Sequence, residues 1–364
     1  MKKQKICIIG GSLTGLVTAI SLSKLNCEID LVIGSPTQNL KSTRTIAISE
    51  NNFDFLNKLN IAKSLKKELW PCSIMKLYTE ILDGKFSEIF KLNNENKQEK
   101  ILYMVENLKI MKLMMNKIKK IKSISIKKNE KVSLISAPGL LKSVKFNNNN
   151  SKYHLVIICT GYNSSLVKNL FNDQIVENSY GESAITTILN HSSFKNNTVR
   201  QIFLDNEIFA LLPISNTKTS IVLTVKKNTQ KKNNLLLKKK IKFYAKNYLK
   251  NITFVNNIEY KDLNFLIRNK YYLDRILLFG DALHVVHPFV GQGFNMTLRD
   301  LACLEEILTK KINLGLDIGS SDILSEFSRQ TKLRNFAFSM SVDLLKKSIF
   351  FKKLRNDILK ILDK

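Results

Sequence analysis

Hydrophobic residues near the N-terminus follow a spacing that predicts a strand, a helix and a second strand. KICIIG is a short apolar run closed by glycine, as expected of a buried parallel strand. TGLVTAISLSKL spaces its apolar residues along one helical face, and IDLVI is again a short apolar run. Residues 5–33 therefore predict a βαβ unit that opens an α/β domain. The basic and then apolar start resembles a signal peptide, but the glycine pair and SLSK favour the βαβ interpretation.

The rest of the chain alternates between helical spacing and short apolar runs. Short strands are predicted within residues 123–160, in RILLFGDA, and as a hairpin around SNTK over residues 209–225. Helices are predicted near residues 50–70, 101–122, 233–250, 297–312, 322–346 and 349–362. In the second of these, we interpret the apolar face as core packing; its residues are Leu108, Met111, Met114, Met115 and Ile118.

Composition narrows the class of protein without fixing its function. The 364 residues are 44% hydrophobic, and no run of about 18 apolar residues predicts a membrane-spanning helix. The net charge of +28 would suit nucleic acid, anionic lipid or an anionic cofactor. Lysine, asparagine and isoleucine are plentiful throughout, as AT-rich coding produces, so we predict no nucleic-acid partner. The cysteines are odd in number and form no CxxC pair, which favours free thiols in a reducing cytoplasm; they are Cys7, Cys27, Cys72, Cys159 and Cys303.

The glycines of GGSLTG have the outer spacing of a dinucleotide-binding turn. Gly10 would allow the tight turn after the strand, and Gly15 would let the helix pack closely on it. Between them, the small Ser12 would let a pyrophosphate approach the amides of the helix N-terminus. The acidic residue that should hold a ribose is missing, because Ile33 stands at that place. Asp30 has nearly the right spacing but is predicted to lie in mid-strand, so we do not assign it that role.

A second chemistry-bearing segment, GDALHVVHPFVGQGFNMTLRD, follows the strand RILLFG. Asp281, His284 and His287 would be the ligands of a metal site there, but zinc needs three or four convergent ligands. Pro288 and the glycines of GQG indicate a loop instead. The remaining histidines, His154 and His191, lie in unrelated segments. We therefore predict no metal.

The favoured interpretation of this segment is a second nucleotide-binding turn. Asp281 at a strand end can accept hydrogen bonds from sugar-like hydroxyls. Gly291 and Gly293 let the amides of a helix start approach a ring or a phosphate. The simpler alternative is that Asp281 only caps a helix.

Two glycine motifs far apart on one α/β chain resemble the group A flavoprotein monooxygenases with the para-hydroxybenzoate hydroxylase fold. Within that group, GDALHVVHPFVGQGFNMTLRD is similar to the signature of the ubiquinone-biosynthesis hydroxylases, the family of UbiH, UbiF and Coq6. STRTIAISENNFDFL resembles the family segment whose arginine, here Arg44, lies by the flavin. YMVENLKIMKLMM resembles the segment that places Glu106 and Asn107 near the ribityl chain, and SYGESAIT and IFALLPI also match.

The resemblance implies an α/β fold in which a Rossmann-like FAD-binding domain is interleaved with a smaller β-sheet substrate domain and followed by C-terminal helices. The implied FAD-binding domain comprises residues 1–70, 97–172 and 268–330, the substrate domain 71–96 and 173–267, and the C-terminal helical region 331–364. The implied cofactor-binding residues are Gly10, Gly11, Ser12, Thr14, Gly15, Arg44, Glu106, Gly161, Gly280, Asp281, Pro288, Gly291, Gln292, Gly293 and Asn295. No amino-acid catalyst is implied, because the flavin carries the chemistry.

The implied activity is an aromatic-ring hydroxylation that uses FAD, NAD(P)H and O₂ through a flavin C4a-hydroperoxide, acting on a polyprenylphenol in ubiquinone biosynthesis. Four positions depart from the family pattern: Ile33, Ser42 and Thr160 replace acidic residues, and Lys168 replaces an arginine. Thr160 and Ile33 favour the alternative of a catalytically degenerate FAD-binding paralogue that scaffolds a biosynthetic complex, whereas the intact segment from Gly280 to Asp300 favours the active hydroxylase. A basic RNA- or membrane-binding protein on a reused fold ranks last.

The C-terminal segment is compatible with two locations of the protein in the cell. KKSIFFKKLRNDILKILDK repeats apolar residues among lysines, which suits either a docked terminal helix or a basic amphipathic helix on a membrane. We expect a cytoplasmic protein, with peripheral binding to the inner face of the membrane, or to a ubiquinone-biosynthesis complex, as open alternatives.

Overall fold

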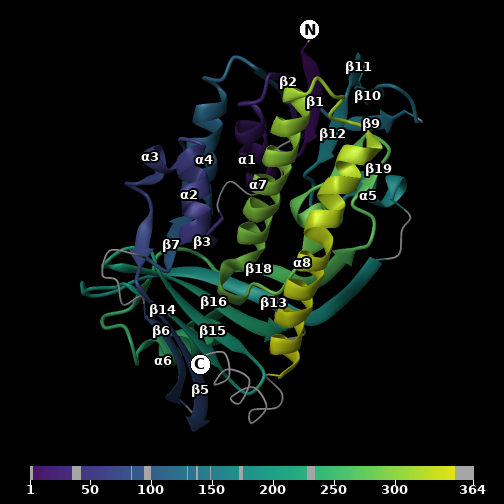
Figure 1. Cartoon of the computed structure of the whole chain (residues 1–364). Coiled ribbons are helices and arrows are strands. Elements are labelled where there is room, and N and C mark those ends of the chain that lie inside the picture. Colours follow the sequence, from purple (N-terminus) through teal and green to yellow (C-terminus); the bar gives the residue numbers. More distant parts are fainter. Residues whose placement is uncertain are drawn as a thin grey trace.

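The computed structural model describes residues 3–34, 42–82, 84–93, 100–128, 130–136, 138–147, 149–171, 175–227 and 234–348, and the structural statements below concern these residues. A mostly parallel sheet lies in the upper half of Figure 1, and a larger mixed sheet lies in the lower half. Among the described helices, none is both long and apolar enough to cross a membrane.

The parallel sheet has the order β19-β20-β12-β1-β2-β8, and β19 runs antiparallel to β20. Its strands are β1 (Gln4–Ile9), β2 (Cys27–Ile33), β8 (Ile124–Lys128), β12 (Leu155–Ile158), β19 (Tyr272–Leu273) and β20 (Ile276–Leu278). The βαβ unit predicted for residues 5–33 is confirmed by β1, helix α1 (Leu13–Leu22) and β2. Because β1 lies between β12 and β2, chain order reverses direction there, and ligands of such sheets bind beyond the strands' carboxyl ends.

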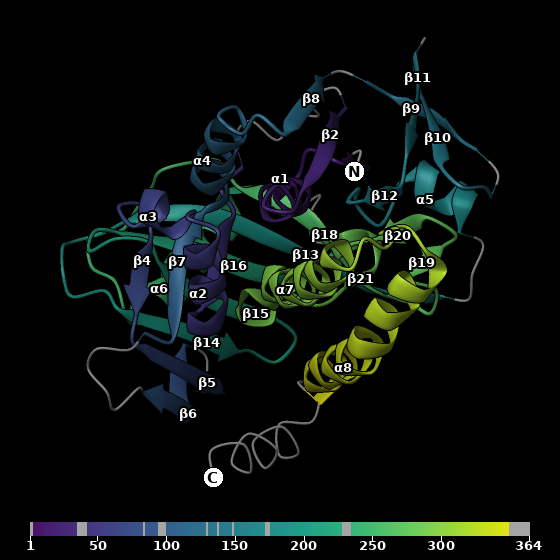
Figure 2. The same ribbon diagram turned by 45° about the horizontal axis from the view of Figure 1, so that its top comes forward.

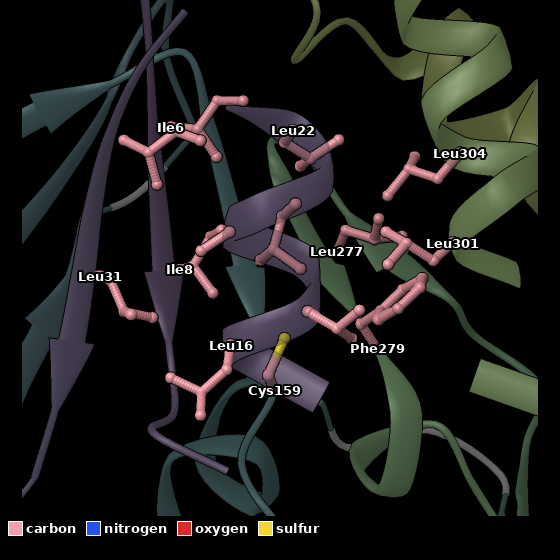
Figure 3. Packing of buried hydrophobic residues seen from close by; sticks show 14 of the residues in the cluster. Ile6, Ile8, Leu16, Leu22, Leu31, Cys159, Leu277, Phe279, Leu301 and Leu304 are labelled. Carbon is pink, nitrogen blue, oxygen red and sulfur yellow. The ribbon is translucent and has the colours of Figure 1, made fainter. Parts of the chain in front are cut away.

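Helix α1 lies between the parallel sheet and helix α7 (Gln292–Asn313), as Figure 3 shows. All of its residues are buried. In that view Leu16 lies on the side of Ile8 and Leu31 of the sheet, and Leu22 lies between Ile6 of the sheet and Leu304 of α7. This sandwich fixes the N-terminus of α1 at the carboxyl end of β1.

The mixed sheet has the order β21-β18-β13-β16-β15-β14-β5-β6, with β17 also paired to β13. Its strands are β5 (Ile74–Leu82), β6 (Lys85–Asn93), β13 (Ile175–Asn190), β14 (Thr198–Phe203), β15 (Ile208–Pro213), β16 (Lys218–Lys226), β17 (Thr253–Phe254), β18 (Glu259–Arg268) and β21 (His284–Val285). Helix α6 (Asn234–Ala245) covers a separate core on this sheet through Leu237 and Ile241. The predicted hairpin around SNTK is confirmed as β15 and β16, and the predicted basic helix as α6.

Two smaller sheets and several helices complete the described chain. One sheet joins β9 (Val132–Ile135), β10 (Lys142–Phe146) and β11 (Asn149–Tyr153), and the other joins β3 (Thr45–Ser49), β4 (Trp70–Cys72) and β7 (Leu102–Glu106). The remaining helices are α2 (Glu50–Lys58), α3 (Ala62–Leu65), α4 (Asn107–Ile118), α5 (Ser165–Leu170) and α8 (Ser321–Ser348), with the 3₁₀ turns η3 (Gly280–Ala282) and η4 (Phe289–Gly291). In Figures 1 and 2, α7 lies between α1 and α8.

Two helix predictions differ from the structure, and a third is not tested by it. Residues 102–106 form strand β7 rather than helix, because they pair on both sides with β3 and β4. Helix α4 therefore starts at Asn107, and its buried residues are Ile110, Met114 and Ile118. The helix predicted over 50–70 is broken after α2, where Asn60 has a φ of 56°. The helix predicted near 349–362 lies outside the described residues.

Candidate functional site

The turn between β1 and α1 requires its glycines. Gly10 has a φ of 133°, and a Cβ there would lie 2.7 Å from the Cys159 carbonyl oxygen. A Cβ on Gly15 would lie 1.9 Å from the Gly10 carbonyl oxygen. A Cβ on Gly11 would collide with Ile33, the residue that replaces the expected ribose acid. The sharp turn and the close helix packing predicted from GGSLTG are therefore present.

The N-terminus of α1 is left open for an anion. Ser12 is its N-cap residue, but the Ser12 hydroxyl donates to the Cys159 carbonyl at 3.3 Å and accepts no hydrogen bond from a helix amide. The first turn of α1 holds no acidic residue. The helix's first amides have no partner within the helix, and its dipole adds partial positive charge there.

The two glycine motifs meet at this turn. Strand β20 ends next to β12, and η3 follows it at once. Gly280 has a φ of 62°, and a Cβ there would lie 2.6 Å from Cγ2 of Thr14. Asp281, the next residue, is exposed.

Gly291 forms the other end of the second motif and starts α7. It has a φ of 68°, and a Cβ there would lie 3.0 Å from Cβ of Ala47. Gln292 and Gly293 are partly exposed, and a Cβ on Gly293 would meet nothing within 4 Å. Pro288 is exposed as well. The backbone of this turn thus borders open space.

Asn295 is buried, and its side chain is taken up by protein groups. Its Nδ2 donates to the carbonyl oxygens of Ala47 at 2.8 Å and of Gly291 at 3.2 Å. Its Oδ1 accepts from the Ser49 amide at 3.0 Å and from Asn52 Nδ2 at 2.8 Å. The side chain therefore ties the start of α7 to β3 and α2, so any contact with a ligand would come from its backbone.

Glu106 and the segment CTGYNSSLVK have surroundings that give less indication of a bound ligand. Glu106 pairs with Lys109 at 2.8 Å at the start of α4. Gly161 is exposed, and a Cβ there would meet nothing within 4 Å. Thr160 keeps its buried hydroxyl without a hydrogen-bond partner among the described residues. Lys168 is hydrogen-bonded to Asn163 at 2.9 Å.

Asp30, rejected as the ribose ligand, lies within β2 as predicted. It is buried, accepts a hydrogen bond from the Tyr153 hydroxyl at 2.7 Å and pairs with Lys5 at 3.4 Å. These contacts give it a structural role that joins β2 to β11 and β1.

The two histidines of the second motif lie in different environments. Nε2 of His284 lies 3.0 Å from Asp300, which also accepts from Arg334 and Asn335 of α8. His287 is buried, and neither ring nitrogen has a hydrogen-bond partner among the described residues. Burial lowers the pKa of His287 to about 3. The described residues contain no group of three potential metal ligands.

Three charged side chains from separate elements act on one another at this site. Arg44 precedes β3, Asp281 lies in η3, and Lys261 lies in β18. Burial lowers the pKa of Lys261, Asp281 raises it and Arg44 lowers it. Within the described part of the chain, none of the three side chains has a hydrogen bond or an ion pair. They are therefore available to a polar ligand.

Lys261 was missed by the sequence reasoning. It shares a face of β18 with Leu263 and Phe265, which are buried. A lysine in line with two buried apolar residues is the signal that would have drawn attention to it.

A family model described as an FAD binding domain matches residues 3–331. Among curated relatives, the mitochondrial ubiquinone biosynthesis monooxygenase COQ6 of Dictyostelium discoideum is 23% identical, over 96% of this chain and 86% of its own length. The ubiquinone hydroxylase UbiL of Rhodospirillum rubrum is 23% identical, over 94% of this chain and 81% of its own length.

Solved structures share the fold at lower identity. A probable FAD-dependent monooxygenase of Pseudomonas aeruginosa, PqsL, superposes with a TM-score of 0.84 at 14% identity, covering 98% of this chain and 99% of PqsL. HpxO of Klebsiella pneumoniae, solved with FAD and uric acid, gives a TM-score of 0.77 at 14% identity, covering 98% and 95% of the two chains.

The chain belongs to the FAD-binding domain family. It is an FAD-dependent monooxygenase, and the resemblance to the ubiquinone-biosynthesis hydroxylases read from its motifs is confirmed. The residues fit the cofactor, because an open helix N-terminus, unpaired charged groups and open space beside glycine backbone meet at one edge of the parallel sheet.

Proposed function

We propose that this protein hydroxylates the aromatic ring of a polyprenylphenol precursor in ubiquinone biosynthesis, using NAD(P)H and O₂. The observation that carries the proposal is the meeting of Thr14 and Gly280, which joins the two glycine motifs into one site. The names of the COQ6 and UbiL relatives support the choice of substrate class.

In this proposal, different parts of the site bind the pyrophosphate and the ribityl chain of FAD. The turn formed by Gly10, Gly11, Ser12 and Gly15, with the first turn of α1 at Thr14, receives the pyrophosphate. The carboxylate of Asp281 accepts hydrogen bonds from ribityl hydroxyls.

The loop beside the ring system is assigned separately. Pro288, Gly291, Gln292 and Gly293 border the isoalloxazine through their backbone. When bound, FAD supplies hydride acceptance and the activation of O₂, while the chain binds it, orients it and excludes water.

The remaining predicted residues have supporting roles in the same site. Arg44 places a positive charge beside the cofactor, and Glu106 and Gly161 line its approaches. Asn295 supports the loop by holding Gly291 against Ala47.

We also propose that the two large sheets mark the two predicted domains. The parallel sheet would be the core of the FAD-binding domain, made by residues 1–70, 97–172 and 268–330. The mixed sheet would be the core of the substrate domain, made by residues 71–96 and 173–267. The short β21, at residues 284–285, would join the two, because it belongs to the second glycine motif yet pairs with β18.

The first experiment is an anaerobic titration of the purified, FAD-loaded protein with NADPH and then NADH, followed by its visible spectrum. Bleaching of the flavin that is accelerated by a prenylated phenol is the expected result. A bound flavin that stays oxidised with every donor and phenol would favour the scaffold alternative. Failure to bind FAD at all would overturn the proposed function.

We further propose that α8 brings the enzyme to an anionic lipid surface, where a polyprenyl substrate resides. Its apolar residues Leu333, Phe336, Met340 and Leu344 follow one another at helical spacing and are 77%, 45%, 37% and 59% exposed. Such an exposed stripe on a strongly basic chain matches the chemistry of an anionic membrane surface. The KKSIFFKKLRNDILKILDK tail lies largely outside the described residues.

Vesicle sedimentation tests this surface. Leu333→Ser with Leu344→Ser should reduce binding to phosphatidylglycerol-containing vesicles by about tenfold, because two exposed apolar side chains leave the contact. Leu314→Ser is the matched control, since Leu314 is 72% exposed but lies past the end of α7. Equal loss in the control, or binding to neutral and anionic vesicles alike, would contradict the proposal.

A further inference from the structure

Lys261 is placed beside the cofactor site by the register of the mixed sheet. On β13, Thr186 pairs with Glu259, and Ala184 pairs with Lys261. The Thr43 amide donates to Oε1 of Glu259 at 2.6 Å, and the hydroxyls of Thr43 and Thr186 lie 2.9 Å apart. Residues two apart on a strand share a face, so Lys261 points from β18 to the side where the chain passes from Thr43 to Arg44.

The opposite wall is formed by the second glycine motif. Strand β21 pairs antiparallel with β18 at Leu266 and Ile267, so the chain that continues to Pro288 runs towards the Lys261 end of β18. The backbone of Arg44 is fixed by a hydrogen bond, because its carbonyl oxygen accepts from the Asn107 amide at 2.9 Å. Lys261 therefore lies between two segments that the proposed function assigns to the flavin.

Lys261 is close to other charged groups of the site. Its side chain is accessible to solvent, yet burial is the largest cause of its lowered pKa. Asp281 raises this pKa and Arg44 lowers it, so both charged groups lie near the Lys261 ammonium.

Arg44 and Lys261 are two cations near each other, with the carboxylates of Asp281 and Glu259 on the same side. Among the described residues, the side chains of Arg44 and Lys261 make no ion pair. Two cations that share a partly desolvated space repel each other. An anion placed between them would remove this cost.

We propose that Lys261 is the residue that stabilises the negative charge acquired by the isoalloxazine ring when the flavin is reduced. The inference rests on the proposed function, which places that ring beside Pro288 and Gly291. The pyrophosphate is the other anionic part of FAD, and it is assigned to the N-terminus of α1 on the parallel sheet. The Lys261 ammonium would lie near the ring, where its positive charge would favour the anionic reduced form.

The test compares Lys261→Met, which removes the charge at similar length, with Lys261→Arg, which keeps it. Lys261→Gln is a second neutral variant. Lys218→Met is the matched control, because Lys218 is exposed on β16 of the same sheet, away from the site. The measurements are the reduction potential of bound FAD, the affinity for sulfite, which adds to oxidised flavin and creates the same ring anion, and the affinity for oxidised FAD.

In Lys261→Met and Lys261→Gln, we expect sulfite affinity to fall about tenfold or more. The reduced flavin should lose affinity relative to the oxidised form by a similar factor, which is about 30 mV for a two-electron couple. Lys261→Arg and Lys218→Met should retain the values of the unmodified protein. Oxidised FAD should bind with affinity unchanged within about threefold, because the oxidised ring carries no charge.

Three results would overturn the inference. An unchanged reduction potential and sulfite affinity in both neutral variants would show that Lys261 does not act on the ring. The same result would be seen if Lys261 bound the phenol substrate instead, because no phenol is present in these measurements. A loss of affinity for oxidised FAD without a change in potential would place Lys261 at the pyrophosphate. Failure of the unmodified protein to bind FAD would overturn the proposed function as well, which separates the two failures.

Discussion

Thr14 and Gly280 touch across the interface between helix α1 and turn η3, so that a Cβ on Gly280 would lie 2.6 Å from Cγ2 of Thr14. Gly280 also holds a φ of 62°, which side chains disfavour. The contact places the turn after β1 directly against the turn after β20. The position of Asp281 relative to the α1 N-terminus therefore depends on the absence of a side chain at Gly280.

Alanine substitutions at Gly280 and Gly293 distinguish a glycine that the fold requires from a glycine that leaves space for FAD. Gly280→Ala should destabilise the FAD-free protein by about 2 kcal/mol or more, through backbone strain and the Thr14 contact. Gly293→Ala should leave its stability unchanged or slightly higher, because a Cβ there meets nothing and alanine favours helix. It should nevertheless weaken FAD binding about tenfold or more, by filling the space proposed for the ring.

Thermal unfolding of the FAD-free proteins and fluorescence titration with FAD measure the two effects. If Gly293→Ala bound FAD as tightly as the unmodified protein, the ring would not approach this turn.

Asp281 should matter for the cofactor and little for the fold. Its side chain is exposed and has no hydrogen bond among the described residues, so Asp281→Asn removes no internal contact. A carboxylate that accepts hydrogen bonds from ribityl hydroxyls is worth about 1.5–3 kcal/mol, or roughly 10- to 100-fold in FAD affinity. Titration with FAD should show that loss, with the unfolding temperature of the FAD-free protein unchanged. A helix-capping role would give the reverse: lower stability and normal binding.

The elements that lie close in sequence were predicted well, because their periodicity is local. The βαβ unit of residues 5–33 and the hairpin of β15 and β16 follow directly from apolar spacing and turn residues. Strand β7 was taken for the start of a helix because LYMVE is short and apolar, and short apolar runs suit either structure. Its pairing with β3 and β4 decided the outcome, and that pairing is not encoded locally.

The site was only partly accessible from the sequence for the same reason. Gly10 and Gly280 stand out because unusual backbone angles demand glycine at fixed offsets. Lys261 does not, because its approach to Arg44 and Asp281 depends on the register of β18 and β13. Asn295 stood in a recognisable motif, but its partners Ala47, Ser49 and Asn52 come from β3 and α2.

Asn295 should be a determinant of stability. Asn295→Ala would leave the Ala47 carbonyl and the Ser49 amide without this partner in a buried place, at a cost of about 2–4 kcal/mol. Urea unfolding of the FAD-free protein measures the change. Asn57→Ala on the exposed side of α2 is the matched control and should change stability by less than about 0.5 kcal/mol. A similar small effect at Asn295 would mean that water replaces its contacts.

His287 should make the fold sensitive to mild acid. It is packed between Tyr180 and Phe289, at ring distances of 5.3 Å and 4.7 Å. Burial, and secondly the positive charge of Lys346, lowers its pKa from 6.5 to about 3. Lys346 is itself paired with Glu182 at 2.7 Å, so the cation is fixed near the ring.

The sign of the effect follows from proton binding. Between pH 6.5 and about 3, the unfolded chain binds a proton at His287 that the folded chain does not, so acid favours unfolding. The free energy of unfolding should fall by about 1.4 kcal/mol per pH unit in this window from this residue. His287→Phe removes the proton site and keeps an aromatic ring, so from pH 6.5 to 5 the variant should lose about 2 kcal/mol less than the unmodified protein. Urea unfolding at pH 7.5, 6.5 and 5 measures the difference, with pH 7.5 as the reference where His287 is neutral in both states. Parallel pH profiles for the two proteins would show that His287 can take up a proton in the folded state.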